Sequence, residues 1–155
     1  MQEAYGDHIQ PAPGPGIAVL VKEGRLGRKS GRGFYSYKEG KKRGVEESVY
    51  GLLGVHPNGG PRPAEILQRL VLGMVNEAAR ALGESVVRSP RDGDIGAIFG
   101  FGFPPFRGGP LRYADDLGAE RVVTDLERLA ERHGARFAPC EVLQEHARAG
   151  TKFYA

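Results

Sequence analysis

The sequence predicts an all-α fold, and three observations lead to this prediction. Between residues 63 and 83, apolar side chains recur at steps of three and four, which is the period of one helical face. Segment 120–133 repeats this spacing and is followed by Gly134, a residue typical of helix ends. No segment shows convincing alternation of apolar and polar residues, the pattern of a half-buried strand. The second part of the chain is therefore predicted to be a helical bundle with short connections.

The first part of the chain has no clear core element. Residues 10–16 (QPAPGPG) are a proline- and glycine-rich breaker. Five apolar residues, 17–21, fit a buried strand and a helix equally well. The aromatic segment 34–37 is predicted to be extended. Residues 41–62 are charged and then rich in glycine and proline, which predicts a linker with one helix around residues 46–53.

The helices of the second part have recognisable starts. Pro63 suits the first turn of the helix over 63–83. Ser89 is predicted to cap a short helix that has Pro90 at its first position and an acidic residue, Asp92, three residues after the cap. Helices are then expected over residues 111–117, 120–133 and 139–149.

Between the second and third of these helices lies the most unusual segment, from Gly100 to Pro110. All of its residues except Arg107 are Gly, Pro or Phe, so it cannot be the interior of a helix or a central strand. We expect a rigid loop whose rings, Phe103 and Phe106 above all, are buried between helices. The predicted structural loop residues are Gly100, Gly102, Phe103, Pro104, Pro105, Gly108 and Gly109.

Composition limits the class of protein. The 155 residues contain one cysteine, which excludes an internal disulfide, and no apolar run approaches the roughly 20 residues of a membrane span. The N-terminus lacks the pattern of a signal peptide, so a cytoplasmic location is expected. The net charge is +3. Four of its cations lie in the segment 38–43 (KEGKKR), which is either a solvated linker or a phosphate-contacting patch.

Several ordered motifs give a resemblance to a known family. They are the run from Met74 to Arg80, the run from Ser89 to Gly96, the Gly-Phe-Pro-Pro loop that follows, and the ends Ala138 to Leu143 and Lys152 to Tyr154. With them the chain resembles the C-terminal end of the multifunctional fatty-acid β-oxidation enzyme α subunit, of the trifunctional-protein type. The segment from Gly24 to Tyr37 is similar to the end of the first of the family's two helical repeats.

The resemblance implies a helical bundle of the 3-hydroxyacyl-CoA dehydrogenase C-terminal domain type, which is 6-phosphogluconate dehydrogenase C-terminal-like. It assigns residues 1–40 to the end of the first repeat, 41–62 to a linker and 63–155 to the second repeat. It also favours a short helix for residues 17–21, ending at Gly24. Because most of the first repeat and both catalytic regions would be absent, we expect the chain to be a truncated piece of a larger protein.

The parent enzyme implied by the resemblance is an NAD-dependent 3-hydroxyacyl-CoA dehydrogenase, an oxidoreductase of lipid metabolism that also carries an enoyl-CoA hydratase region. Its NAD domain and its His–carboxylate dyad have no counterpart here, so no catalytic residue and no metal ligand is assigned, and this segment is expected to bind no cofactor. The expected partners are the upstream domains, acyl-CoA in the parent, a thiolase subunit in the parent complex and further copies of the chain, but no nucleic acid.

One position carries an expected substrate contact. A tyrosine precedes the loop in the family, and Phe99 stands in its place, so the ring is kept and the hydroxyl is lost. Packing is the expected role of Phe99. The substrate-contacting Asn–Arg pair of the first repeat corresponds to Gln68 and Arg69 in this repeat. The second repeat is therefore expected to be a degenerate copy that supports the acyl-CoA cleft and packs on the first.

Three other patterns partly match known binding motifs, and each lacks a feature that the motif requires. The glycines at Gly100 and Gly102 follow a predicted helix and not a strand, which argues against a dinucleotide site. Residues 24–30 lack the glycine before Lys29 that a phosphate-binding loop requires. Residues 32–37 loosely match an RNA-binding strand, but no four-stranded sheet is predicted. Cys140 is expected to be a small buried hydrophobe. A free-standing helical interaction protein remains an alternative function.

Overall fold

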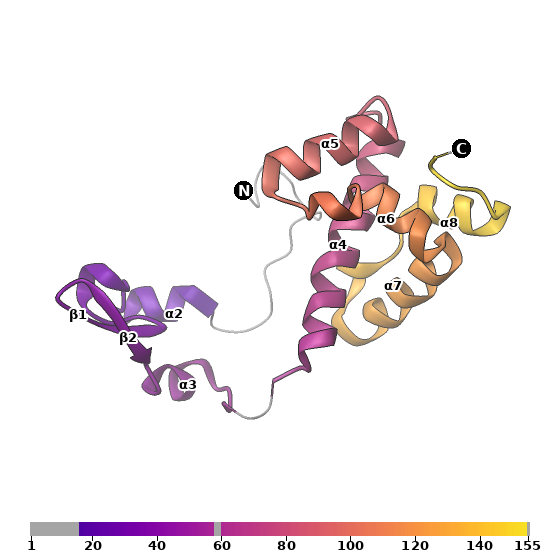
Figure 1. The fold of residues 1–155 in the computed structure, drawn as a ribbon. Helices are drawn as coiled ribbons and strands as arrows, with labels where there is room; N and C mark the ends of the chain where they lie inside the picture. The colour runs from indigo at the N-terminus through magenta and orange to yellow at the C-terminus, as the bar shows by residue number, and fades with distance from the viewer. Residues whose placement is uncertain (1–15, 58–59, 155) are drawn as a thin grey trace. The chain divides into compact units, whose positions relative to one another are not determined.

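The computed structural model describes residues 16–57 and 60–154. The chain divides into two compact units, Met1–Pro61 and Arg62–Ala155, and each is described here by itself. Figure 1 gives the labels of the helices and strands. No helix within the described residues is long and apolar enough to cross a membrane.

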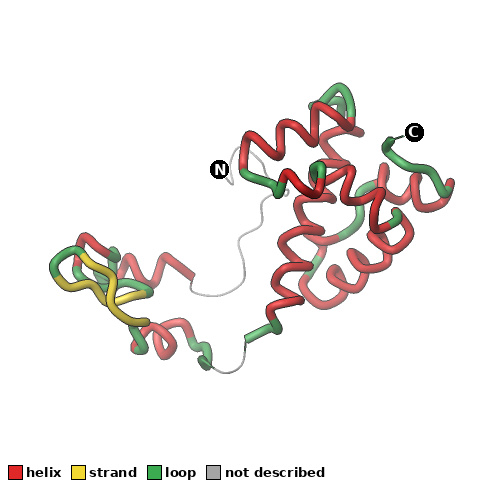
Figure 2. The backbone as a smooth tube through the Cα atoms, in the orientation of Figure 1, coloured by secondary structure: helices red, strands yellow, loops and turns green. Residues whose placement is uncertain are grey.

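The second unit is a helical bundle built on its longest helix, α4 (Pro63–Gly83). α5 (Pro90–Phe101), α6 (Pro110–Leu117) and α8 (Glu141–Ala149) all contact α4, and α7 (Ala119–His133) packs against α8 (Figure 1). Two single-turn 3₁₀ helices, η3 (Pro105–Arg107) and η4 (Ala135–Phe137), lie in the connections. The described part of this unit contains no strand (Figure 2).

The core of the bundle follows from the helical periodicity. Fully buried Val75, Leu111, Val122, Leu126 and Leu143 come from four different helices. Burying each such side chain favours folding by about 1.5–3 kcal/mol.

A buried polar residue, Asn76, sits in this core and ties α4 to the segment before α8. Its Nδ2 donates to the Ala138 carbonyl oxygen at 2.9 Å, and its Oδ1 accepts from the Cys140 backbone N–H at 2.8 Å. Both ends of the amide are therefore used, as a buried polar group requires.

The first unit combines two short helices with a hairpin. α2 (Gly16–Lys22) buries Leu20 and contacts α3 (Ser48–Leu53), which buries Val49. Between them lie the 3₁₀ helix η2 (Arg28–Ser30) and the antiparallel strands β1 (Tyr35–Lys38) and β2 (Lys41–Val45), shown in yellow in Figure 2. Ser30 orders the loop before β1, because its hydroxyl accepts from the Leu26 N–H at 2.8 Å and donates to the Arg32 carbonyl at 3.0 Å.

Most helices expected from the sequence are confirmed. The boundaries of α4 agree with the predicted 63–83, and Ser89 caps α5 by accepting a 3.1 Å hydrogen bond from the Asp92 N–H. The helical alternative for residues 17–21 is the one that forms. The helix expected around residues 46–53 is α3.

The segment predicted to be extended, 34–37, forms most of β1, and its pairing with a second strand was not predicted. Residues 41–62, expected to be a linker with one helix, contain β2 in addition to α3. Every residue of β2 is exposed, so apolar and polar residues do not alternate along it. The local signal was the turn at Glu39 and Gly40, whose φ angles of 54° and 71° fit the two-residue turn that matches strand twist.

Candidate interaction surface

The Gly-Phe-Pro-Pro segment begins as the last turn of α5 and then leaves it. Gly100 and Phe101 are still helical, and Gly102 ends the helix with φ of 80°. The Phe103 N–H then donates to the Ala97 carbonyl oxygen at 3.1 Å, which holds the turn against α5.

The two rings singled out in this loop have opposite environments. Phe103 is 3% exposed and packs at a tilt against Tyr113 of α6, with 6.4 Å between the ring centroids. Phe106 is 83% exposed, so the expectation that it is buried is wrong. Pro104 and Pro105 separate the two rings and lead into the single turn η3, which directs Phe103 inward and leaves Phe106 at the surface.

Phe99 is also exposed, at 85%, so the packing role expected for it is not found within the described residues. It lies in the last turns of α5 with its ring in contact with solvent. This ring is therefore accessible to another molecule or domain.

The end of the loop fits tightly against α5. Gly109, with φ of 109°, leads into α6, and a Cβ atom at Gly109 would collide with the side chain of Asp94. Asp94 accepts hydrogen bonds from the backbone N–H groups of Leu111 at 2.7 Å and Arg112 at 3.1 Å. A carboxylate at a helix start is favoured by the helix dipole, so Asp94 caps α6 from the neighbouring helix.

A groove of about 540 Å³ opens beside this loop. Its apolar walls come from α4, the loop and α6, and include Leu67, Val71, Phe106 and Leu117. Arginines also line it, at Arg62, Arg107, Arg121 and Arg132. Glu65 and Asp125 line it as well, and Asp125 pairs with Arg121 at 3.9 Å. The groove therefore has apolar walls with a charged border of both signs, which suits a protein segment or another amphipathic partner.

The apolar surface continues along α4. Leu67, Leu70 and Met74 are spaced by three and four residues, so they form one stripe, and all three are exposed. Ile66 adds to the exposed apolar residues of this helix. We call Leu67, Leu70, Met74 and Phe106 the apolar surface of the second unit. Contiguous exposed apolar groups of this kind mark interaction sites.

The cysteine and histidines considered as candidates for chemistry make contacts within the fold. Cys140 is buried, as expected, and burial raises the pKa of its thiol, which disfavours the nucleophilic thiolate. His133 contacts Glu65 at 3.2 Å, and His146 contacts the Thr151 hydroxyl at 2.9 Å. His8 lies outside the described residues. Gln68 lines the groove.

The fold and the surface together define a class: a helical domain with an exposed apolar face. The family described as "3-hydroxyacyl-CoA dehydrogenase, C-terminal domain" matches residues 66–153, which is more than half of the chain. The chain belongs to this family.

The relatives are proteins named "Fatty acid oxidation complex subunit alpha". That of Shewanella loihica is 54% identical over 136 residues, which cover 87% of this chain and 19% of the relative. Those of Vibrio vulnificus and of Vibrio cholerae are also 54% identical over 136 residues, and these cover 88% of this chain and 19% of each relative. The chain thus spans about a fifth of the length of these relatives.

Proposed function

We propose that this chain is the C-terminal helical segment of a multifunctional β-oxidation enzyme and that it packs against preceding domains of that enzyme. The observation that carries the proposal is the apolar surface of the second unit, taken with relatives about five times longer than the chain. A domain of a larger protein must bury such a surface on its neighbours, since apolar area removed from water gains roughly 25 cal/mol per Å².

The role proposed here is support and not chemistry. The chain would complete the packing around the acyl-CoA cleft, and the oxidation of 3-hydroxyacyl-CoA with NAD would take place in domains outside it. Gly100 and Gly102 support this division, because they lie in the last turn and at the end of helix α5, whereas a dinucleotide site needs a strand before its glycines. A cytoplasmic location and a thiolase subunit as partner of the parent belong to the same proposal.

Residues 1–40, in this proposal, are the end of the first helical repeat, and residues 63–155 are the second repeat. Phe99 would contact substrate or a neighbouring domain through its ring alone. Its exposure of 85% supports that availability. The residues from Phe103 to Gly109 would hold the loop in place, since Phe103 is buried and Gly109 leaves no room for a side chain.

Reconstitution with a relative tests the proposal. The α subunit of Vibrio cholerae would be shortened by its region corresponding to this chain, and the purified chain would then be added. We expect a one-to-one complex in calorimetry and a gain in 3-hydroxyacyl-CoA-dependent NADH formation. The chain by itself should form no NADH above background.

Two variants connect this test to the surface. Leu67→Asp places a charge on the apolar surface and should weaken the complex by tenfold or more, about 1.4 kcal/mol or greater. Val86→Asp is the matched control, because Val86 is at least as exposed as Leu67, lies outside α4 and belongs neither to the groove nor to the stripe. Equal effects of the two variants, or no complex with the wild-type chain, would contradict the proposed packing role.

A second candidate function is a free-standing helical interaction protein, and the same apolar surface favours it. In that case the chain would pair with copies of itself. Light scattering over a concentration series separates the two. Self-association of the chain without binding to the shortened relative would favour the free-standing protein. Loss of that self-association in Leu67→Asp would indicate that the copies contact one another through the apolar surface.

A further inference from the structure

The first unit carries an excess of positive charge that its own contacts do not use. Residues 16–57 contain nine Lys and Arg against four Asp and Glu, whereas residues 60–154 contain thirteen of each. We propose that one face of the β1–β2 hairpin, with Lys38, Lys41 and Arg43, binds a small polyphosphate, a molecule with two or more adjacent phosphate groups. We call these three residues the cationic face.

The register of the hairpin puts these side chains together. Lys38 and Lys41 are directly paired across the turn, so their Cβ atoms are about 5 Å apart on the same face. Arg43 comes two residues after Lys41, at a bulge of β2 where Arg43 and Gly44 together lie opposite Ser36 of β1. All three side chains are exposed. The result is a short cluster of three cations around one point of the ribbon.

Lys42 confirms the assignment of faces. Its Nζ lies 3.7 Å from the centre of the Tyr35 ring, a cation–π contact on the side of the ribbon shared with Tyr35. Because neighbours along a strand point to opposite sides, Lys41 and its partner Lys38 project away from that ring. Lys42 thus has a partner within the hairpin, and the cationic face is on the opposite side of the ribbon from Lys42.

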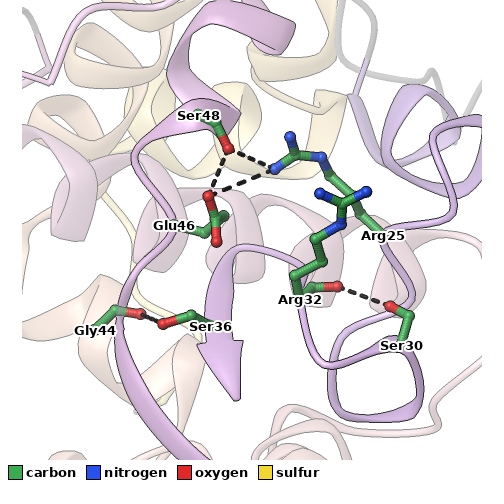
Figure 3. Close-up of polar contacts among 7 residues, drawn as sticks. All are labelled: Arg25, Ser30, Arg32, Ser36, Gly44, Glu46 and Ser48. Carbon is green, nitrogen blue, oxygen red and sulfur yellow. Dashed lines mark hydrogen bonds and ion pairs between the residues drawn. The ribbon is translucent and has the colours of Figure 1, made fainter. Parts of the chain in front are cut away.

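The cationic face is electrostatically costly as it stands. Like charges directly opposite one another destabilise a strand pair, and no ion pair within residues 16–57 involves Lys38, Lys41 or Arg43. Arg25 shows the contrast in Figure 3: its guanidinium donates to the Ser48 hydroxyl at 2.8 Å and lies 3.9 Å from the Glu46 carboxylate. A phosphate-bearing ligand would supply the negative charge that the three residues lack.

The extent of the cationic face favours a small ligand. Glu39 occupies the turn at one end of the hairpin, and Glu46 and Glu47 follow β2 at the other. A nucleic acid or a lipid surface long enough to pass both ends would meet these carboxylates. A compact molecule with adjacent phosphates is short enough to contact Lys38, Lys41 and Arg43 without reaching from Glu39 to Glu46 and Glu47.

Calorimetric titration of the whole chain with inorganic tripolyphosphate tests the proposal. We expect saturable one-to-one binding that weakens as salt is added, since exposed charges are screened. The variant K38Q/K41Q/R43Q should lose affinity by tenfold or more. The control K22Q/K42Q/R91Q removes the same charge from other exposed sites and should lose threefold or less.

A second measurement distinguishes lost binding from a folding defect in the triple variant. Lys41→Gln alone removes the opposed like charge, so it should raise the unfolding midpoint of the first unit while it weakens tripolyphosphate binding. Equal losses in the two triple variants, no saturable binding by the wild-type chain, or tighter binding to phosphatidylglycerol vesicles or an oligonucleotide than to tripolyphosphate would each overturn the proposal.

Discussion

The hydroxyl of Tyr154 donates a 2.6 Å hydrogen bond to Oδ2 of Asp94, which lies 60 residues earlier in the chain. The same tail is held a second time, because the backbone N–H groups of Phe153 and Tyr154 each donate to Asp115 at 2.9 Å. Arg112 stacks over the Tyr154 ring at 3.8 Å. Asp94 thus joins three elements: α5, on which it lies, the start of α6 and the end of the chain.

Removing this hydroxyl should loosen the tail while it leaves the cap of α6 in place. Tyr154→Phe is expected to lower the free energy of unfolding by about 1.5–3 kcal/mol, the range for a hydrogen bond to a charged group. Urea denaturation measures this change. Tyr113→Phe is the control, since the Tyr113 hydroxyl makes no hydrogen bond within the described residues. A loss of stability as large in Tyr113→Phe would refute the assignment.

The same contact predicts a dependence on alkaline pH. Burial raises the pKa of the Tyr154 hydroxyl, and the hydrogen bond and negative charge of Asp94 raise it further. The folded pKa then lies above the unfolded value of about 10. The contribution of Tyr154 is complete below pH 10 and is lost as pH rises above it. Urea melts from pH 8 to 11 should show a smaller difference between wild type and Tyr154→Phe at the alkaline end; a constant difference would contradict this.

The two rings of the loop provide a matched pair of substitutions. Phe103→Ala should cost about 3–5 kcal/mol, because it empties a buried site between the loop and α6. Phe106→Ala should cost less than about 0.5 kcal/mol, as expected for an exposed position. Denaturant melts of both variants decide the point. Similar costs for the two would mean that Phe106 is covered in solution.

Gly109 and Gly118 illustrate two different reasons why a position requires glycine: backbone conformation and lack of space for a Cβ atom. Both have positive φ angles, of 109° and 88°, but only at Gly109 would a Cβ atom meet Asp94, while Gly118 has open space around it. Gly118→Ala should cost about 1–3 kcal/mol for backbone strain alone. Gly109→Ala should cost more, because it also displaces the Asp94 cap. Equal costs in thermal or urea melts would show that Asp94 moves aside freely.

The local elements of this protein were predictable from the sequence, and their surroundings were not. The period of α4 and the Ser89 cap depend on residues three or four apart, so their signals lie in a short stretch of sequence. Of the hairpin, only the extended segment 34–37 was predicted, because every residue of β2 is exposed and no alternation of apolar and polar residues marks it. The resemblance to the family was available from ordered motifs before any coordinate was known.

The tertiary structure alone decided which of two adjacent rings is buried and which side chain caps α6. The loop composition suited burial of Phe103 and Phe106 equally, and only the position of Tyr113 on α6 chose Phe103. Asp94 and Tyr154 carry no mark of their contact in sequence, since a hydrogen bond across 60 residues depends on how α5, α6 and the tail pack. Local hydrogen bonding and periodicity determine helices, whereas burial and long-range polar contacts exist only once the helices are assembled.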